Sequence, residues 1–261
     1  MKPAPPTTTS IATASPDAIV VRGKDLCGEL IGKLSFTEML CWQILGREAA
    51  PAQVAVVDAC LVALMEHGLM PSAIAARLVY SSAPEAMQGA VAAGLLGVGS
   101  RLVGSAEGCA RLLARVAGAA DAAAEAAAVV AEHRAAKRAL PGFGHDVHLP
   151  DDPRTPRLFE VAREHGVAGR HVAAAATLGA ALDRALGRHL TLNATGAVAA
   201  VLADAGVPAE IMRGFALIAR CAGLIGHIHE EQSRPAMRSI WDAAERAVPY
   251  DGGTTTSKEQ P

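Results

Sequence analysis

The segment Ala117–Ala139 reads AGAADAAAEAAAVVAEHRAAKRA, and its composition decides the fold class of the chain. Alanine, glutamate and arginine lose little side-chain freedom in a helix, so such a run favours helix over strand. A membrane span needs about 18 or more consecutive apolar residues, and Asp121 and Glu125 interrupt this run too early. We therefore expect a long helical zone that ends near Ala139 and does not cross a membrane.

The rest of the chain carries the same helical signal. Ser35-Phe-Thr-Glu38 fits a capping box, in which the two polar side chains bond the first backbone N–H groups of a helix. Further helices are expected over residues 52–65, 71–79, 84–96, 156–164, 168–186, 197–205 and 208–232. Only Ala18–Arg22 is apolar and β-branched as a strand would be. The pattern predicts an all-α protein.

Composition and the two ends of the chain set its organisation. Of 261 residues, 51% are hydrophobic and 19% charged, which excludes global disorder. Residues 1–17 are rich in Pro, Thr and Ser and lack an apolar core, so we expect a disordered tail and no signal peptide. Residues 251–261 are polar and are expected to form a flexible tail. The folded body is expected over residues 18–250.

Charge and cysteine usage exclude several classes of protein. Lys and Arg number 24 and Asp and Glu 26, a net charge of −2 that gives no electrostatic reason to bind nucleic acid or a membrane surface. The cysteines are odd in number, scattered and without a CxxC pair, which argues against a disulfide or metal framework. We expect buried free thiols in a reducing cytoplasm. They are Cys27, Cys41, Cys60, Cys109 and Cys221.

Small residues dominate the helix faces. Alanine and glycine let helix axes approach closely, which favours a tightly packed helical body. With aromatic residues at only 3%, the apolar faces must be covered by broad Ala, Leu and Val surfaces. Such surfaces often continue across a subunit boundary, so we expect a homodimer or a higher homo-oligomer. The alternative is that they form only the core of a monomer.

Two histidines and two arginines are the first candidates for chemistry. His67 and His145 lie in glycine-flanked breaks between helices, where an imidazole can reach a ligand and transfer a proton near neutral pH. Each histidine alone also fits a surface or helix-end position. Arg154 and Arg234 lie in or beside proline-containing loops, and arginine binds carboxylates with two parallel hydrogen bonds. Together the four suit a di- or tricarboxylate, although each arginine alone also fits an ion pair within the protein.

Other site classes find little support. His227 and His229 are two residues apart and so face different sides of a helix. His227 and Glu231 would share a face, but a metal site needs more ligands, and we expect none. The chain has no GxSxG elbow, no Walker-type phosphate loop and no GxGxxG that opens a βαβ unit. Hydrolase, NTPase and nicotinamide-dependent functions are therefore not favoured.

Several segments in a fixed order carry a family resemblance that covers about Val21 to Gly252. They are Glu29–Glu38 (ELIGKLSFTE), Glu66–Arg77 (EHGLMPSAIAAR), Pro141–His145 (PGFGH) with Asp152–Arg154 (DPR), Leu192–Gly196 (LNATG), and Gly223–Glu230 (GLIGHIHE) with Arg234–Pro235. Together they resemble the citrate synthase superfamily, and more closely its citryl-CoA lyase branch, which includes the C-terminal module of ATP-citrate lyase. The PGFGH and DPR pair is the most specific of these segments.

The resemblance implies a fold and a reaction. The fold would be a citrate synthase-like helical one with a large helical domain and a small closing domain, here expected at about residues 135–220, in a homodimer. The reaction would be cleavage of citryl-CoA, or a related hydroxyacyl-CoA, to acetyl-CoA and oxaloacetate by a retro-Claisen step. A coenzyme A thioester would be substrate or product, and no permanently bound cofactor is expected.

The resemblance also implies roles for individual residues. His67 would lie against the oxygen groups of the substrate, and His145 would bond the oxaloacetate carbonyl that becomes the citryl hydroxyl. Arg154 and Arg234 would clamp carboxylates.

The adenine end of coenzyme A would lie along the backbone of Pro141, Gly142, Phe143 and Gly144. From their charge alone we expect Lys137 and Arg138 to contact its phosphates, with simple helix-surface charges as the alternative.

Two positions depart from the family pattern. Leu102 stands where the synthases carry a catalytic histidine, which the lyase branch also lacks, so this points to a lyase. Thr195 stands where the family has a catalytic aspartate, and a hydroxyl cannot replace a carboxylate as a proton carrier near pH 7. Either another acid serves, with Glu66 beside His67 as the candidate, or the activity is weak, altered or absent. The alternatives are a non-catalytic protein that binds coenzyme A and carboxylates and, less favoured, a citrate or methylcitrate synthase.

Overall fold

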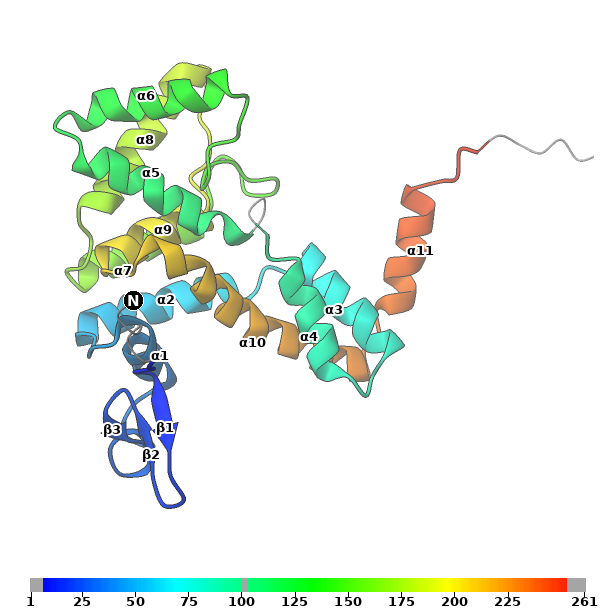
Figure 1. The fold of residues 1–261 in the computed structure, drawn as a ribbon. Helices are drawn as coiled ribbons and strands as arrows, with labels where there is room; N and C mark the ends of the chain where they lie inside the picture. Colours follow the sequence, from blue (N-terminus) through cyan, green and yellow to red (C-terminus); the bar gives the residue numbers. More distant parts are fainter. Residues whose placement is uncertain (1–6, 100–102, 253–261) are drawn as a thin grey trace, which may run out of the picture. The chain divides into compact units, whose positions relative to one another are not determined.

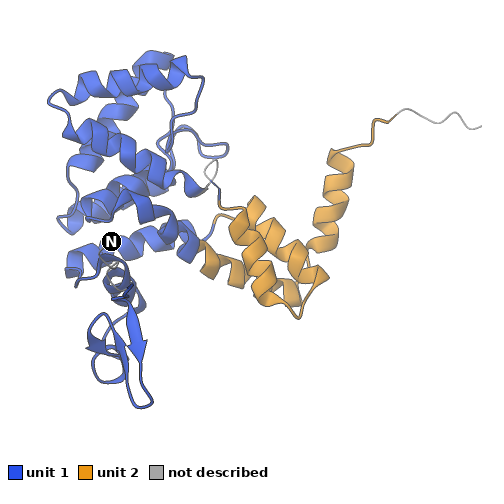
Figure 2. Ribbon diagram, viewed as in Figure 1, with its two compact units in different colours: residues 1–66, 99–219 blue, residues 67–98, 220–261 orange. Residues whose placement is uncertain are grey.

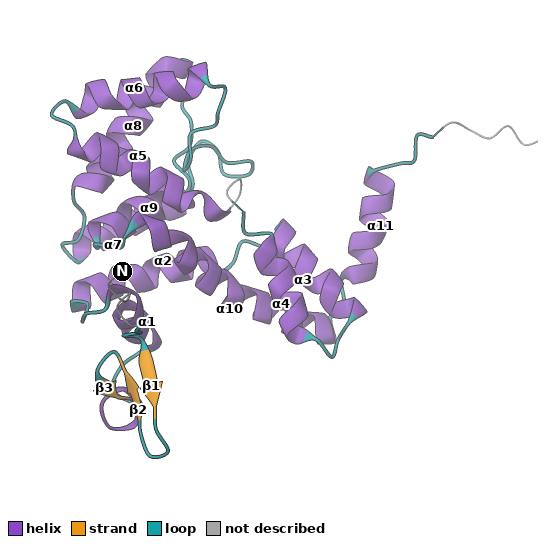
Figure 3. Ribbon diagram, viewed as in Figure 1, coloured by secondary structure: helices purple, strands orange, loops and turns teal. Residues whose placement is uncertain are grey.

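The computed structural model describes residues 7–99 and 103–252, and these form helices with one small sheet (Figure 3). They divide into two compact units (Figure 2). Unit 1 comprises residues 1–66 and 99–219, and unit 2 comprises residues 67–98 and 220–261. The fold class is therefore all-α, as the sequence predicts. The division differs from the expected small lobe at 135–220, because residues 135–219 belong to unit 1.

Unit 1 begins with a small antiparallel sheet in the order β1-β2-β3. Its strands are β1 (Ala12–Ala14), β2 (Ile19–Val21) and β3 (Lys24–Asp25), and a short π-helix, η1 (Leu26–Leu30), follows. Strand β2 lies inside the segment expected to be extended. Strand β1 corrects the expectation of a disordered tail over residues 1–17, because Ala12 pairs with Val21 and Ala14 with Ile19. Residues 1–6 of that tail lie outside the described residues.

The remainder of unit 1 is helical (Figure 1). Its elements are α1 (Phe36–Leu45), α2 (Pro51–Met65), η2 (Val103–Ser105), α5 (Ala106–Gly118), α6 (Ala122–Ala135), α7 (Arg154–Glu164), α8 (Arg170–Leu186), α9 (Ala194–Asp204), η3 (Ala209–Ile211) and the start of α10 (Met212–Ser233). The capping box at α1 is confirmed, since Glu38 N donates to Ser35 Oγ at 3.2 Å and Ser35 N donates to Glu38 Oε2 at 2.7 Å.

The alanine-rich zone is two helices rather than one. Helix α5 ends at Gly118, and α6 begins after Asp121, whose side chain accepts hydrogen bonds from Ala123 N at 3.0 Å and Ala124 N at 2.9 Å. An aspartate at this position satisfies N–H groups that a continuous helix would bond internally, so it starts a new helix. The residue that interrupts the apolar run therefore also divides the helical zone.

Helix α9 is the centre of unit 1. It packs against α2, α5, α7 and α8, and its residues from Gly196 to Leu202 are all buried. The largest side chains of the surrounding core are fully buried, among them Leu113, Leu178 and Phe215. Since alanine and glycine make up much of α9, its neighbours approach it closely. The N-terminus of this buried helix supports the candidate site described below.

Unit 2 contains α3 (Pro71–Ser82), α4 (Met87–Leu96), the end of α10 and α11 (Met237–Ala247). Helix α4 starts three residues later than expected, and the sequence did not predict α11. Helices α3 and α4 pack on each other, and a small core contains Ala73, Ala90 and Leu224. A Cβ at Gly94 would lie 2.8 Å from the backbone oxygen of Ser72 and 2.6 Å from Leu224 Cδ1, so this packing requires glycine there.

Residues Ala209–Ser233 form the one helix in the described part of the chain that has the length and hydropathy to cross a membrane. A core helix passes the same test, and 44% of its most apolar window is buried within the protein. This finding therefore gives only weak support for a membrane span.

The cysteines are free, as expected, but they differ in burial. Cys41, Cys60 and Cys109 are buried, Cys221 is half-buried and Cys27 is exposed. The expectation of a buried thiol is therefore wrong for Cys27. Burial raises the pKa of Cys60 and of Cys109 to about 12, so neither thiol ionises near neutral pH.

Candidate active site

The PGFGH segment is a loop of unit 1 that is fixed to the N-terminus of α9. Gly142 O accepts a hydrogen bond from Asn193 N at 3.0 Å, and Gly144 N donates to Thr191 O at 2.7 Å. The Asn193 side chain adds a bond from Nδ2 to Gly144 O at 2.9 Å. The glycines have φ angles of +86° and +88°, a region that side chains disfavour. Glycine therefore allows this loop to follow the start of α9 closely.

The approach is a backbone contact. A Cβ at Gly142 would lie 2.5 Å from Cys109 Sγ and 2.9 Å from Gly196 Cα. A Cβ at Gly196 would lie 2.6 Å from Gly142 O. Phe143 pairs with Leu192 across the same contact. Both glycines therefore permit the loop to be seated on α9.

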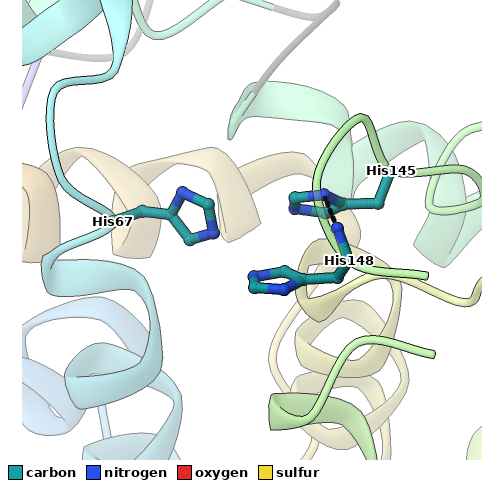
Figure 4. A group of neighbouring side chains, drawn as sticks. All are labelled: His67, His145 and His148. Atoms are coloured by element: carbon teal, nitrogen blue, oxygen red, sulfur yellow. Dashed lines mark hydrogen bonds between the residues drawn. The ribbon is translucent and has the colours of Figure 1, made fainter. Parts of the chain in front are cut away.

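His145 ends the loop, and its ring nitrogen Nδ1 is a hydrogen-bond acceptor for the backbone. Its Nδ1 accepts hydrogen bonds from Val147 N and from His148 N, both at 3.0 Å (Figure 4). An acceptor nitrogen carries no proton, so the neutral ring must carry its proton on Nε2. The backbone of this loop thereby fixes the tautomer in which Nε2–H is a donor.

The surroundings keep the His145 ring neutral. Burial is the main cause that lowers its pKa, and the His148 ring, 4.4 Å away between centroids, lowers it further (Figure 4). Arg154 acts in the same direction, while Asp152 and Asp146 oppose it. A neutral imidazole with its proton on Nε2 is a hydrogen-bond donor without a charge. Such a group suits an oxygen on which negative charge develops.

This geometry makes a spectroscopic prediction. In ¹⁵N NMR, His145 is expected to show a protonated Nε2 and an unprotonated Nδ1, and to titrate below the ordinary histidine pKa of about 6.5. His148→Ala is expected to raise the pKa of His145, because it removes a ring that lowers this pKa and admits water. His189→Ala, at an exposed histidine bonded to Asp183 and Asp151, is the matched control and should leave that pKa unchanged. A His145 pKa that falls or stays constant in His148→Ala would contradict this account.

Arg154 is held by Asp152 of the same DPR motif. The Asp152 carboxylate is fully buried and accepts from Arg154 N at 3.1 Å, Nε at 3.0 Å and Nη2 at 2.8 Å, and from Ala194 N at 2.9 Å. Burial alone would raise the pKa of Asp152, but the bonds from Arg154 and Ala194 outweigh it and set the pKa at about 2. The Arg154 side chain is 25% exposed, and its Nε and Nη2 donate to Asp152.

Thr195 is the second residue of α9 and is half-buried. Its neighbours at this helix N-terminus are bonded within the protein: Ala194 N to Asp152, and Gly196 N to Asn193 Oδ1 at 3.1 Å. The structure therefore brings Thr195, the His145 loop and the DPR motif together at one end of α9.

The residues expected to bind coenzyme A lie between α6 and this loop and in the loop itself. Lys137 and Arg138 are exposed directly after α6, and Lys137 has a φ of +49°. Pro141 and Gly144 are half-buried, whereas Gly142 and Phe143 are buried. The two cations are therefore open to solvent, while the loop backbone is mostly engaged with α9.

The other expected residues lie beyond unit 1 or at its edge. Glu66 is exposed at the end of α2, and His67, half-buried, is the first residue of unit 2. Arg234 is exposed in the turn between α10 and α11 of unit 2. Convergence of these side chains with those of unit 1 stays a prediction. Leu102 lies outside the described residues.

Four residues that received no role above stand out in the structure. The His148 ring lies beside the His145 ring, Asp152 holds Arg154, and Arg77 and Arg220 are each only 3% exposed. Arg220 was recognisable as the one charge in the apolar run Gly214–Gly226. The other three acquire meaning only through contacts that the sequence does not display.

Comparison with known proteins identifies the family. The model of the citrate synthase C-terminal domain matches residues 13–241. A curated relative from Mycobacterium tuberculosis, "Putative citrate synthase 2", is 33% identical over 203 residues, which are 74% of this chain and 51% of the relative. A relative of the same name from Mycobacterium bovis matches equally. The chain belongs to the citrate synthase family, and it spans about half the length of the curated relatives it matches.

Solved structures point to a narrower group. Citryl-CoA lyase from Hydrogenobacter thermophilus is 32% identical with a TM-score of 0.83, over 98% of this chain and 97% of that one. ATP citrate lyase from Methanosaeta concilii, in complex with (3S)-citryl-CoA, shares the fold at 21% identity and a TM-score of 0.77, over 96% of this chain and 43% of its own. The similarity to the citryl-CoA lyase branch is thus confirmed.

Proposed function

We propose that the protein is a carbon–carbon lyase that cleaves citryl-CoA, or a related hydroxyacyl-CoA, to acetyl-CoA and oxaloacetate. The observation that carries the proposal is the fixed tautomer of His145, whose Nδ1 is occupied by two backbone N–H groups and whose ring stays neutral. The similarity to a citryl-CoA lyase along nearly the whole of both chains supports it. Self-association is part of the same proposal, since α11 buries none of its residues and leaves Trp241 51% exposed.

The reaction requires a donor where His145 provides one. Cleavage begins when the tertiary hydroxyl of citryl-CoA loses its proton, and the alkoxide then becomes the carbonyl of oxaloacetate. The electrons of the broken carbon–carbon bond pass into the thioester enolate, which takes up a proton to give acetyl-CoA. A neutral Nε2–H aimed at the alkoxide oxygen stabilises its charge, and a preorganised donor of this kind supplies about 3–4 kcal/mol in other enzymes. Arg154, held by Asp152, would bind a carboxylate of the same substrate.

Coenzyme A would lie along the PGFGH loop. The seating of Gly142 and Gly144 on α9 makes this backbone rigid, which favours binding of an extended ligand. Lys137 and Arg138 are exposed and would meet the phosphates. The thioester itself is the substrate, so the proposal needs no permanently bound cofactor.

Thr195 favours a second candidate function. A threonine cannot carry the proton that must leave the hydroxyl, so the chain either uses another acid, with Glu66 as our candidate, or binds without turnover. The alternative is a non-catalytic protein that binds coenzyme A and carboxylates. A citrate or methylcitrate synthase is the least supported of the candidate functions.

The decisive experiment gives the purified protein citryl-CoA and measures acetyl-CoA and oxaloacetate. His145→Ala and Arg154→Ala are each expected to reduce kcat/KM by about 10²-fold or more. Matched controls are His165→Ala and Arg157→Ala, at exposed positions on or next to α7, and both should retain activity. Binding of coenzyme A without turnover above the His145→Ala background would support the non-catalytic alternative instead.

The same assay locates the proton acceptor. If the missing carboxylate limits the rate, Thr195→Asp raises kcat, whereas Glu66→Gln abolishes turnover if Glu66 has taken over the role. A kcat that neither variant alters would show that a different group accepts the proton.

A further inference from the structure

A buried ion network lies inside unit 2. Arg77 of α3 is only 3% exposed, and its guanidinium bonds three side chains of α10. Nη1 donates to Glu231 Oε2 at 2.6 Å, Nε donates to His227 Nδ1 at 3.0 Å, and Nη2 donates to Glu230. His227 and Glu231, the pair considered as partial metal ligands, are thus joined through an arginine. A buried cation with this many bonds fixes α3 against α10.

The other oxygen of Glu231 holds the start of α11. Oε1 accepts from Ala236 N at 2.8 Å, from Met237 N at 3.0 Å and from Ser81 Oγ at 3.1 Å. Ala236 is the residue before α11 and has no side chain that can cap the helix. Glu231 supplies the cap from the preceding helix instead, and its negative charge also interacts favourably with the positive end of the helix dipole.

The Glu231 carboxylate therefore fixes the end of the turn at Ala236 and Met237. The turn contains Arg234, whose N–H donates to Glu230 O at 2.7 Å, and then Pro235, whose φ is restricted. Little backbone freedom is left between Glu231 and Met237. The direction in which Arg234 leaves the backbone is set by this arrangement.

We propose that Glu231 and Arg77 are positioning residues for Arg234, and that the Arg77–Glu231 pair sets the affinity of the protein for a carboxylate of its substrate. This rests on the proposed function, which assigns Arg234 to such a carboxylate. Arg77 keeps Glu231 ionised, and Glu231 holds the turn from which Arg234 reaches out.

Electrostatics support the arrangement. Burial is the largest influence on the pKa of Glu231 and would raise it, but the bonds from Arg77, Met237, Ala236 and Ser81 together lower it. Glu231 therefore stays an anion at neutral pH, as the cap of α11 and the charge of Arg77 both require.

Glu231→Gln tests the proposal, with Glu230→Gln as its matched control. Both glutamates bond Arg77, but only the Glu231 side chain bonds α11, and the Glu230 side chain is 52% exposed. Glu231→Gln is expected to raise KM for citryl-CoA about tenfold with little change in kcat, the signature of lost ground-state binding. It should also speed hydrogen exchange at the amides of Ala236 and Met237. Glu230→Gln should leave KM and exchange within about twofold of the parent.

A double-mutant cycle with Arg234→Ala decides whether the effect passes through Arg234. The combination Glu231→Gln with Arg234→Ala is expected to raise KM no further than Arg234→Ala alone, and additive effects on KM would overturn the proposal. Arg77→Lys should reproduce part of the KM increase of Glu231→Gln, because lysine keeps the positive charge but lacks the several planar N–H donors of the guanidinium. Unchanged exchange at Ala236 and Met237 in Glu231→Gln would also overturn it.

Failure of the proposed function gives a different result. If the unmodified protein does not turn over citryl-CoA, the cycle is measured on the dissociation constant for citrate, and exchange still reports whether Glu231 holds the turn. If citrate does not bind either, the assignment of Arg234 to a carboxylate falls and the positioning proposal falls with it.

Discussion

Replacing Asp152 with asparagine is expected to lower the free energy of unfolding by about 2–3 kcal/mol, because it breaks an ion pair whose carboxylate is buried and leaves Arg154 uncompensated. The carboxylate is fully buried and accepts from three nitrogens of Arg154 and from Ala194 N. Asparagine has one acceptor oxygen and no charge, so it cannot accept all four of these hydrogen bonds. Urea unfolding of the two proteins at pH 7 measures the loss.

The pH dependence of stability provides a second readout for Asp152. Its pKa in the folded protein is about 2, below the ordinary 3.8, so its contribution is present above pH 3.8 and is lost as pH falls towards 2. The shift corresponds to about 2 kcal/mol. Asp152→Asn should lose this part of the acid sensitivity. Asp151→Asn, at a carboxylate 71% exposed, is the control, and an equal midpoint for the two variants would disprove the account.

Gly142→Ala is expected to lower the free energy of unfolding by about 2–6 kcal/mol and to abolish activity. A positive φ of +86° costs a non-glycine residue about 1–3 kcal/mol. Overpacking adds about 1–3 kcal/mol, since the new Cβ would lie 2.5 Å from Cys109 Sγ and 2.9 Å from Gly196 Cα. The loop that carries His145 would then leave the N-terminus of α9. Unfolding and citryl-CoA turnover together measure the effect.

Two further variants separate the backbone penalty from the steric clash. Gly166→Ala has a φ of +66° in open space, so it should show only the smaller backbone penalty and keep activity. Adding Cys109→Ala to Gly142→Ala removes the sulfur from the clash and should recover part of the stability. If Gly142→Ala is no less stable than Gly166→Ala, the close backbone approach is not needed for folding.

Local rules predicted most of the helices. The Ser35–Glu38 capping box identified the start of α1 because both partners lie within four residues. The alanine-rich zone showed the limit of such reasoning, since composition indicated helix throughout but only the Asp121 side chain ends one helix and starts another. Strand β1 was missed because a three-residue strand is stabilised by its pairing with β2 and carries little signal of its own.

The candidate site was predictable where it is compact in sequence. The His145 loop and Arg154 were recognisable from glycine, proline and motif order. The partners were not: Asp152 looks like any loop aspartate until its burial is seen, and Arg77 and Glu231 are 154 residues apart. The tautomer of His145 depends on two backbone N–H directions, which no residue type specifies.

The distribution of thiols has a practical consequence. Cys60 and Cys109 cannot ionise near neutral pH, and Cys41 is buried. A maleimide dye is therefore expected to react readily with Cys27 in unit 1 and more slowly with Cys221 in unit 2. The unaltered chain thus offers one labelling handle on each unit. Donor and acceptor fluorophores at these two positions would report any change in the distance between the two units during ligand titration, with no engineered cysteine.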